Sequence, residues 1–495
     1  MTHEALATVR YSRRASQGVV LGIDKPGIWS LGIAIAPVMA TVVTQGPFTA
    51  VFVAILMSPL AITGLIKRHG IALTLWLVWA ARFRLRKMMG RAMFKRRVKR
   101  AEPIIRGELQ LPGLEERFQI WESPSGIAVV WDKARQTASI TCMVTSPGMA
   151  RHRTQVMTAH DREQLTGALM RVAGSWTRRR QIMRVSMQER TRPGTIVREQ
   201  RTFDELGATG DLADSYQEAL TRVAEESVLH PQSITLTIDA GGGAGRAAAK
   251  DLGGGKAGIL GMVEQEIAAT TESLRVAGFT KVVWTSPREW GAWGRGIVDP
   301  VAEGKIDIRL GTAFEGIAPE LAGPMSCIDE KDYVETDSAF HRVYWIAEYP
   351  RLETLPGFMG EVASAETSAG IPVRHTLQIV GTPVPIEQAL KGIRKQRKSW
   401  KQNAALKARR GNDVTIADNS DWQNLDAREQ DLINGQGELA WTGFVVVSAL
   451  SHEALLHSCT SMELAGSTAS IELVPLTYQQ AAALMSVAYP AGTGM

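Results

Sequence analysis

One segment of the sequence has residue types that could bind a phosphate, the glycine-rich stretch 241–258 that contains Lys256. A P-loop, G-x-x-x-x-G-K-[ST], would place a glycine at Lys250 and a magnesium-binding hydroxyl at Ala257, so both positions fail. Residues 253–258 match the dinucleotide fingerprint G-x-G-x-x-G, but they lie far beyond the end of the preceding strand, where that fingerprint must begin. We therefore expect a flexible connection between a strand and a helix, and no cofactor.

Neither a metal site nor a nucleophile beside a base is indicated. His452 and His457 are five positions apart, so on a helix their side chains point about 140° away from each other and cannot share a metal ion. The three cysteines have no C-x-x-C spacing, which excludes a zinc ribbon and suits a reducing compartment. Asp329–Glu330 lacks the apolar run that precedes the acidic pair of an ATPase. These patterns predict a protein that is not an enzyme and has no catalytic, cofactor-binding or metal-binding residue.

Basic residues form the first pattern that does indicate a binding surface. Between Arg82 and Arg100 the sequence has ten Lys and Arg residues and no acidic residue. Each basic side chain near an anionic leaflet contributes at most about 1 kcal/mol, so together they can hold a segment on a membrane. The expected membrane-surface residues are Arg82, Arg84, Arg86, Lys87, Arg91, Lys95, Arg96 and Arg97. The alternative is a stop-transfer flank that contacts only water.

A second basic group has nine Lys and Arg residues from Lys391 to Arg410, with no acidic residue between them. Six acidic residues follow from Asp413 to Asp431, so two antiparallel helices of opposite charge would neutralise each other, at a few tenths of a kcal/mol per exposed pair. This internal pairing is the favoured interpretation. The alternative is a docking arm for a partner protein, with Lys391, Arg394, Lys395, Lys398 and Lys401 as the docking residues. Binding of nucleic acid is the least favoured.

The distribution of charge also argues against nucleic acid. Residues 1–100 contain 16 Lys and Arg residues against Glu4 and Asp24, a net charge of +14, whereas the remaining residues sum to −8. The pI of 9.2 therefore reflects the amino-terminal end. We expect no direct sequence-specific binding of nucleic acid by the acidic remainder.

Two kinds of structure must position these residues, and the first is a membrane hairpin. Residues 26–66 are 41 positions without Asp, Glu, Lys, Arg or His, which suffices for two spans of roughly 20 residues. Gln45, Gly46 and Pro47 supply a turn, which places helices near 28–44 and 47–66. The basic flanks put both termini in the cytoplasm by the positive-inside rule. The alternatives are a buried hairpin in a soluble core and, for residues 71–81, a third or re-entrant membrane segment.

The second kind of structure is a cytoplasmic α+β part made of two similar halves. In each half the expected order of elements is strand, helix, strand, inserted helix, strand, helix, strand. This is the order of a ferredoxin-like, split βαβ unit with a helical insertion. In the first half we expect strands near 127–131, 137–145, 181–189, 234–238 and 281–285, and helices near 160–176, 203–229 and 258–277. In the second half we expect strands near 342–349, 373–380, 441–449 and 470–474, and helices near 358–368, 387–434 (two), 452–464 and 478–488. The expected domains are residues 1–100, 101–330 and 331–495, with an inserted helical hairpin at about 385–435.

Several short segments, taken in order, resemble a known family. They are Arg13 and Arg14 with residues 18–22 before the hairpin, residues 344–351, the long helical hairpin, residues 441–447 and residues 488–490. The chain resembles actinobacterial membrane proteins of conjugative elements, in which a PrgI-like transmembrane hairpin is joined to the amino-terminal, non-motor part of a conjugation-type ATPase. The resemblance covers nearly the whole chain and includes no catalytic motif. Larger relatives continue into a RecA-like motor with Walker motifs, whereas this sequence ends at Met495.

The resemblance implies a non-catalytic scaffold subunit of a type IV secretion-like apparatus for conjugative DNA transfer. Its location would be the cytoplasmic membrane, and its partners would be the lipid bilayer, other secretion-apparatus subunits and a separate ATPase in a hetero-oligomer. One alternative is a nucleotide-binding hydrolase that uses the glycine-rich loop with Lys256. Another is a membrane subunit of type VII secretion, which also has two spans followed by a soluble domain.

Overall fold

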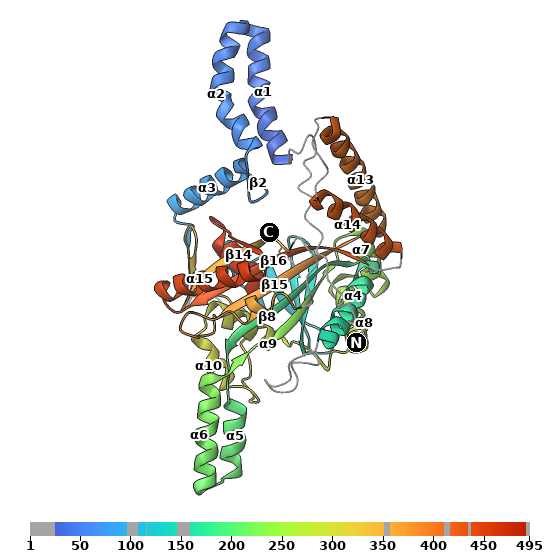
Figure 1. The fold of residues 1–495 in the computed structure, drawn as a ribbon. Coiled ribbons are helices and arrows are strands. Elements are labelled where there is room, and N and C mark those ends of the chain that lie inside the picture. The colour runs from blue at the N-terminus through green and yellow to red at the C-terminus, as the bar shows by residue number, and fades with distance from the viewer. Residues whose placement is uncertain are drawn as a thin grey trace, which may run out of the picture.

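The computed structural model describes residues 25–96, 107–114, 116–145, 159–350, 357–409, 416–433 and 437–491. The protein is a mixed α+β structure in which two apolar amino-terminal helices stand on one side of a large antiparallel sheet domain (Figure 1). The predicted class, α+β with an amino-terminal apolar hairpin, is confirmed.

The apolar hairpin consists of α1 (Lys25–Gln45) and α2 (Pro47–Leu65), joined at Gly46, whose φ of 90° favours glycine. Small residues let the two helices approach closely, since a Cβ added at Gly64 would lie 1.8 Å from the Ser30 hydroxyl. The segments Gly27–Gln45 and Pro47–Leu65 are long and apolar enough to cross a membrane, and only 17% and 11% of them is buried. A helix in a soluble core would be mostly buried, so these values argue against a soluble hairpin.

A short connector joins the hairpin to the domain. It contains β1 (Lys67–Arg68), β2 (Ile71–Ala72), α3 (Leu73–Met88) and β3 (Met93–Lys95). α3 runs sideways from the base of the hairpin rather than along it (Figure 1). Residues 71–81 therefore form no third helix beside α1 and α2.

The domain is built on one sheet of 15 strands among the described residues, in which every pair of neighbours is antiparallel. Its main path is β3-β12-β13-β14-β16-β15-β8-β10-β7-β6-β5-β4. The strands of the first half are β4 (Glu108–Leu109), β5 (Phe118–Glu122), β6 (Ala128–Asp132), β7 (Thr137–Thr145), β8 (Ile182–Pro193), β9 (Val228–Leu229), β10 (Gln232–Asp239) and β11 (Lys281–Trp284). Those of the second half are β12 (Ser326–Asp329), β13 (Val334–Glu335), β14 (Phe340–Glu348), β15 (His375–Val384), β16 (Glu438–Ala449) and β17 (Glu472–Pro475).

The two halves have the same strand order. In the first half the order is β11-β7-β10-β8, and in the second half it is β17-β14-β16-β15. Numbered along each half, both orders read 4-1-3-2. The first half has crossover helices α4 (Ala159–Arg178) and α8 (Gly255–Val276), and the second has α12 (Gly360–Ala363) and α15 (His452–Thr468).

Each half has a helical hairpin inserted between its second and third strands. The first contains α5 (Val197–Leu206) and α6 (Asp211–Glu226), and the second contains α13 (Ile386–Arg409) and α14 (Ile416–Ile433). The halves meet where β8 pairs with β15, in a register that places Gln188 opposite Gln378. The sheet is therefore continuous from one half to the other.

Side chains alternate along the strands between two packed faces. On β16, Val445 and Val447 pack with α12 and α15, whereas Val446 faces a core formed with α9 (Pro287–Val298) and α16 (Gln480–Ala488). On β6, Val129 belongs to the core beneath α4 and α8, whereas Val130 faces the α9 and α16 side. The sheet is thus covered on both faces.

Several expected elements are corrected. The helix expected over 203–229 is two helices and a strand, because Gly207 takes a left-handed conformation that ends α5. The helix expected over 358–368 is only the four-residue α12. The connection before residue 258 is largely helical, since α7 (Gly243–Asp251) precedes α8. Sequence periodicity also did not predict the elements between the halves, which are α9, α10 (Ala302–Asp307), α11 (Pro319–Ala322), β12 and β13.

Candidate functional site at the membrane connector

The connector is the place where basic residues, apolar helices and the sheet domain meet. α3 begins directly after the hairpin, and its first turns pack against α2, where Thr74 donates a hydrogen bond to Thr63 over 3.4 Å. Trp76 and Trp79 make an edge-on contact at 5.4 Å between ring centroids. Near the other end of α3, Phe83 is buried with its ring 5.7 Å from that of Tyr478, which precedes α16. One helix therefore contacts both the apolar hairpin and the domain.

Two consecutive basic residues of α3 pair with two consecutive acidic residues at the end of β12. The Arg86 guanidinium lies 3.1 Å from the Asp329 carboxylate and also donates to the Tyr478 carbonyl over 3.0 Å. Lys87 donates to both carboxylate oxygens of Glu330, over 3.0 and 2.8 Å. These contacts cross 243 residues of sequence, so they fix the connector to the domain.

Asp329 is the buried member of this group. Its side chain is 4% exposed, against 40% for Arg86. Burial raises the pKa of Asp329 to about 6, although the Ala481 amide and Arg86 both favour its charged form. The Ala481 amide donates to Oδ1 over 3.1 Å, near the start of α16. Asp329 therefore joins α3, β12 and α16 through one carboxylate.

Backbone pairing continues the junction. β3 pairs antiparallel with β12, with Phe94 opposite Cys327, and so becomes the edge strand of the large sheet. Beyond it, the Arg96 amide donates to the Met325 carbonyl over 2.9 Å, and the Arg96 guanidinium bonds the Glu320 carbonyl. A further contact lies nearer the hairpin, where His69 is 2.7 Å from Glu472. The connector is thus attached along its whole described length.

The opposite face of α3 is apolar and has no partner within the described chain. Leu77, Ala81, Leu85 and Met88 recur at helical spacing, and Leu77, Leu85 and Met88 are 52%, 52% and 84% exposed. Such a stripe is typical of a helix that lies in the membrane interface.

The expected membrane-surface residues divide between these two faces. Arg86, Lys87 and Arg96 bind the domain, as described above. The side chains of Arg82, Arg84, Arg91 and Lys95 are exposed and have no ion pair or hydrogen bond to any described residue. Arg97 lies outside the described residues. Four cations therefore remain available for anionic headgroups.

The expected docking residues lie together on α13. Lys391, Arg394, Lys395, Lys398 and Lys401 recur on one side of the helix, and the side chains of the first four have no ion pair or hydrogen bond to any described residue. The Lys401 ammonium lies 5.8 Å from the Trp422 ring of α14. Pairing between the two helices is made instead by Arg397, which contacts Asp426 and lies 2.6 Å from Glu429. The docking side of α13 thus stays open.

The glycine-rich stretch makes several contacts within the domain. The Lys256 ammonium lies 4.9 Å from the centre of the Trp121 ring, which itself stacks on Trp131. The amides of Gly241 and Gly242 donate to the Asp239 carboxylate over 3.0 and 2.8 Å. The lysine and the first amides of the loop therefore already have partners within the domain.

His452 and His457 have different surroundings on α15. His452 packs between the rings of Tyr333 and Phe340, at 4.7 and 5.9 Å, and His457 is exposed on α15. Within the described ranges, no group of three or more His, Cys, Asp or Glu side chains could hold a metal ion.

Sequence reasoning missed the role of Asp329 and Glu330. It tested them only as the acidic pair of an ATPase, whereas they receive Arg86 and Lys87. The only available signal was the match between a basic dipeptide and an acidic dipeptide, and such short pairs are common in any sequence.

No protein-family model matches the sequence, and the comparison with curated proteins also found no match. The geometry of the connector and the sequence patterns are therefore the basis for the function proposed below.

Proposed function

We propose that the protein is a non-catalytic scaffold subunit that holds a large cytoplasmic domain in a fixed position at the inner face of the cytoplasmic membrane. The connector is the observation that supports this proposal. α3 presents an apolar face with free arginines on one side and is attached to the domain by Arg86, Lys87 and β3 on the other. A flexible tether would need none of these contacts.

We propose further that the scaffold serves a type IV secretion-like apparatus for conjugative DNA transfer and works beside a separate ATPase. This step rests on the resemblance of the sequence to conjugation proteins. The strand order 4-1-3-2 in each half supports the finer description of the fold as two ferredoxin-like units, because each crossover helix joins two strands that have a third strand between them. The helical insertion in each half is consistent with the same description.

The experiment uses charge reversal at the connector and measures transfer of a conjugative element from the native host. Arg86→Glu places a second acid beside buried Asp329, so we expect transfer frequency to fall at least tenfold while the protein stays in the membrane fraction. The double variant Arg86→Asp with Asp329→Arg should recover part of the lost transfer frequency. Arg275→Glu, on the exposed side of α8, serves as the matched control.

Two results would count against the proposal. If Arg86→Glu leaves transfer unchanged at normal protein level, the connector has no role in it. If transfer is unaffected when the whole gene is deleted, the protein serves another process, and a loss of type VII export in that strain would identify the alternative.

A further inference from the structure

The α5–α6 hairpin projects from the domain, and the function proposed from the membrane connector does not explain it. It leaves the sheet between β8 and β9 and extends from the end of the molecule opposite to α1 and α2 (Figure 1). Its base is held by Arg201, whose guanidinium donates to the carbonyls of Leu310 and Ile308 over 2.5 and 3.1 Å. The hairpin is therefore anchored at one end and exposed along the rest of its length.

Its two helices are held together by specific contacts. The side-chain amides of Gln200 and Gln217 exchange two hydrogen bonds of 3.1 and 2.9 Å. The rings of Phe203 and Tyr216 lie 5.4 Å apart. Ala213 and Leu220 of α6 are buried. These residues account for the packing between α5 and α6.

A second apolar stripe on α6 is largely uncovered; among its described residues, Tyr216 contacts α5 through the Phe203 ring and still exposes about half of its surface. Leu212, Tyr216, Ala219 and Val223 recur at i, i+4, i+7 and i+11, the spacing of one face of a helix. Leu212, Tyr216 and Val223 are 89%, 49% and 51% exposed, and Leu206 at the tip of α5 is 74% exposed. A surface of this kind, rimmed by polar residues, marks an interaction site.

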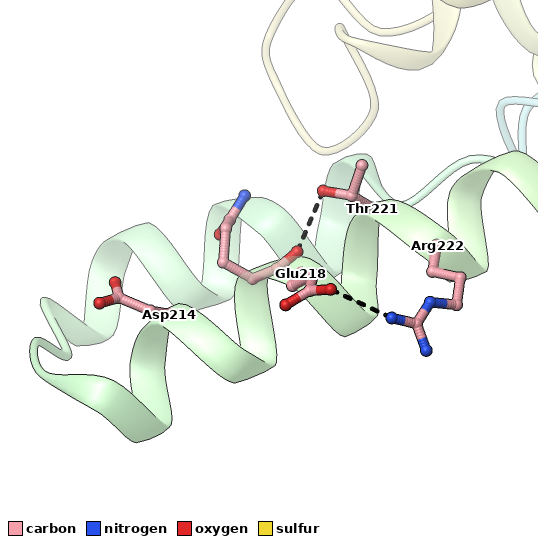
Figure 2. A pocket seen from close by; sticks show the side chains of 5 residues that line it. Asp214, Glu218, Thr221 and Arg222 are labelled. Atoms are coloured by element: carbon pink, nitrogen blue, oxygen red, sulfur yellow. Dashed lines mark hydrogen bonds and ion pairs between the residues drawn. The ribbon is translucent and has the colours of Figure 1, made fainter.

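The other side of α6 is polar, which makes the hairpin two-faced. Asp214, Glu218, Thr221 and Arg222 lie on this side, where Arg222 and Glu218 form an exposed ion pair at 3.1 Å (Figure 2). α6 therefore has one apolar side and one polar side, and its exposed apolar residues are concentrated in a single stripe.

The charge of the hairpin restricts what can cover the stripe. Residues 197–226 contain eight Asp and Glu residues and three Arg residues, a net charge of −5. An anionic lipid surface and the DNA backbone would both be repelled. Two copies of the same hairpin would also repel each other. A cationic partner is attracted, so charge complementarity favours a cationic partner over lipid, DNA or a second copy of the chain.

We propose that the apolar stripe of α6 binds a positively charged amphipathic helix of a partner protein. Residues spaced at i, i+4, i+7 and i+11 accept another helix lying alongside, as in other helix-in-groove complexes. The partner helix supplies apolar side chains to Leu212, Tyr216 and Val223, and its Lys or Arg side chains complement the net negative charge of the hairpin. This inference does not depend on the proposed role in DNA transfer.

The test is photo-cross-linking in cells of the native host. The full chain would carry p-benzoylphenylalanine at Tyr216 and, in a control strain, at Thr221 on the polar side. We expect a Tyr216 adduct with another protein, mapped by mass spectrometry to a segment with apolar residues at helical spacing and a net positive charge. The Thr221 strain should give little of this adduct.

Two variants test the chemistry of the contact without disturbing the hairpin packing. Ala219→Asp, on the exposed stripe, should reduce the adduct about tenfold or more, since a buried charge without a partner weakens an interface strongly. Thr221→Asp adds the same charge to the polar side. With the cross-linker at Tyr216, this variant should leave the amount of adduct unchanged. An adduct with a second copy of this chain, with lipid or with an acidic segment would refute the proposal, as would the absence of any adduct.

Discussion

Asp329 joins three elements with one buried carboxylate, and that placement has a consequence for stability. Oδ1 accepts the Ala481 amide, and Oδ2 lies beside Arg86. Burial nevertheless raises the pKa of Asp329 to about 6, so the loss of hydration outweighs both favourable contacts.

We predict that the protein loses stability between about pH 4 and pH 7 through this residue. A carboxyl group whose pKa is raised in the folded state stabilises the fold below its unfolded pKa of about 4, and this contribution is lost as the pH rises through about 6. The loss would reach at most about 3 kcal/mol. Thermal unfolding of the full chain in detergent should show a weaker pH dependence for Asp329→Asn than for the unchanged protein.

Glu453→Gln, which removes an exposed carboxylate from α15, is the control for that comparison. Equal pH profiles for Asp329→Asn and the unchanged protein would show that Asp329 does not titrate in this range.

We also predict that the purified full chain does not hydrolyse ATP. The glycine-rich stretch lacks the hydroxyl that holds magnesium, and Lys256 lies over the Trp121 ring. Lys256→Ala should therefore lower stability by about 0.5–1 kcal/mol through the lost cation–π contact, and nucleotide binding should stay undetectable. Magnesium-dependent hydrolysis that disappears in Lys256→Ala would contradict the non-enzymatic assignment.

At the scale of elements, α3 is a helix with one face bound to the domain and an opposite, apolar face exposed. We predict that its apolar face enters the lipid interface. An environment-sensitive fluorophore on Met88→Cys should shift to the blue when the protein is reconstituted in vesicles with anionic lipid, and spin-labelled lipid should quench it.

A fluorophore on Ser215→Cys, exposed at the far end of the protein, should show neither effect. Equal quenching at the two positions, or none at Met88, would place α3 away from the membrane.

The open side of α13 leads to a prediction about assembly. Reversing Lys395, Lys398 and Lys401 to Glu should abolish co-purification with a membrane partner while the fold persists, because none of the three has an ion pair to a described residue. Arg397→Glu is the contrasting variant, since it breaks two contacts with α14 and should lower thermal stability instead. If α13 bound DNA, the unchanged protein would bind it tightly at low salt, with a log-log slope near −0.9 per phosphate contacted.

The elements show what sequence patterns could and could not predict. α1, α2, β7 and β10 follow from uninterrupted apolar or alternating residues, so the sequence placed them within a few positions. α5 and α6 were predicted as one helix, although Gly207 and Gly210 between them are the residues that end one helix and allow a turn before the next. β3 could not be predicted, because its three residues form a strand only through their pairing with the distant β12.

The same limit applies to the candidate site. Its basic residues were predicted from their number and spacing, whereas which of those on α3 reach the domain depends on the direction in which each side chain leaves the helix. Arg84 and Arg86 are two positions apart, yet only Arg86 reaches Asp329. Neighbouring residues on a helix point in different directions, so composition alone does not distinguish them.

On the scale of the whole molecule, the apolar hairpin and the acidic α5–α6 hairpin lie at opposite ends (Figure 1). We predict that Gln45→Cys, at the turn between α1 and α2, reacts with a membrane-impermeant thiol reagent on intact cells. Ser215→Cys should react only after the membrane is made permeable. The native cysteines Cys142, Cys327 and Cys459 are buried, so they add little background. The reverse labelling pattern would exclude a cytoplasmic domain.

The pairing of β8 with β15 has a consequence for the symmetry of the protein. β8 and β15 are each the second strand of their half and pair antiparallel, so the order β11-β7-β10-β8-β15-β16-β14-β17 has equivalent strands at equal distances from its centre. A two-fold axis perpendicular to the sheet would relate the halves, as it relates two identical subunits joined edge to edge. The sheet of the described chain thus has the pseudo-two-fold arrangement of a homodimer within one polypeptide. The insertions at equivalent sites of the two halves differ in charge, since α5–α6 is acidic and α13 is basic.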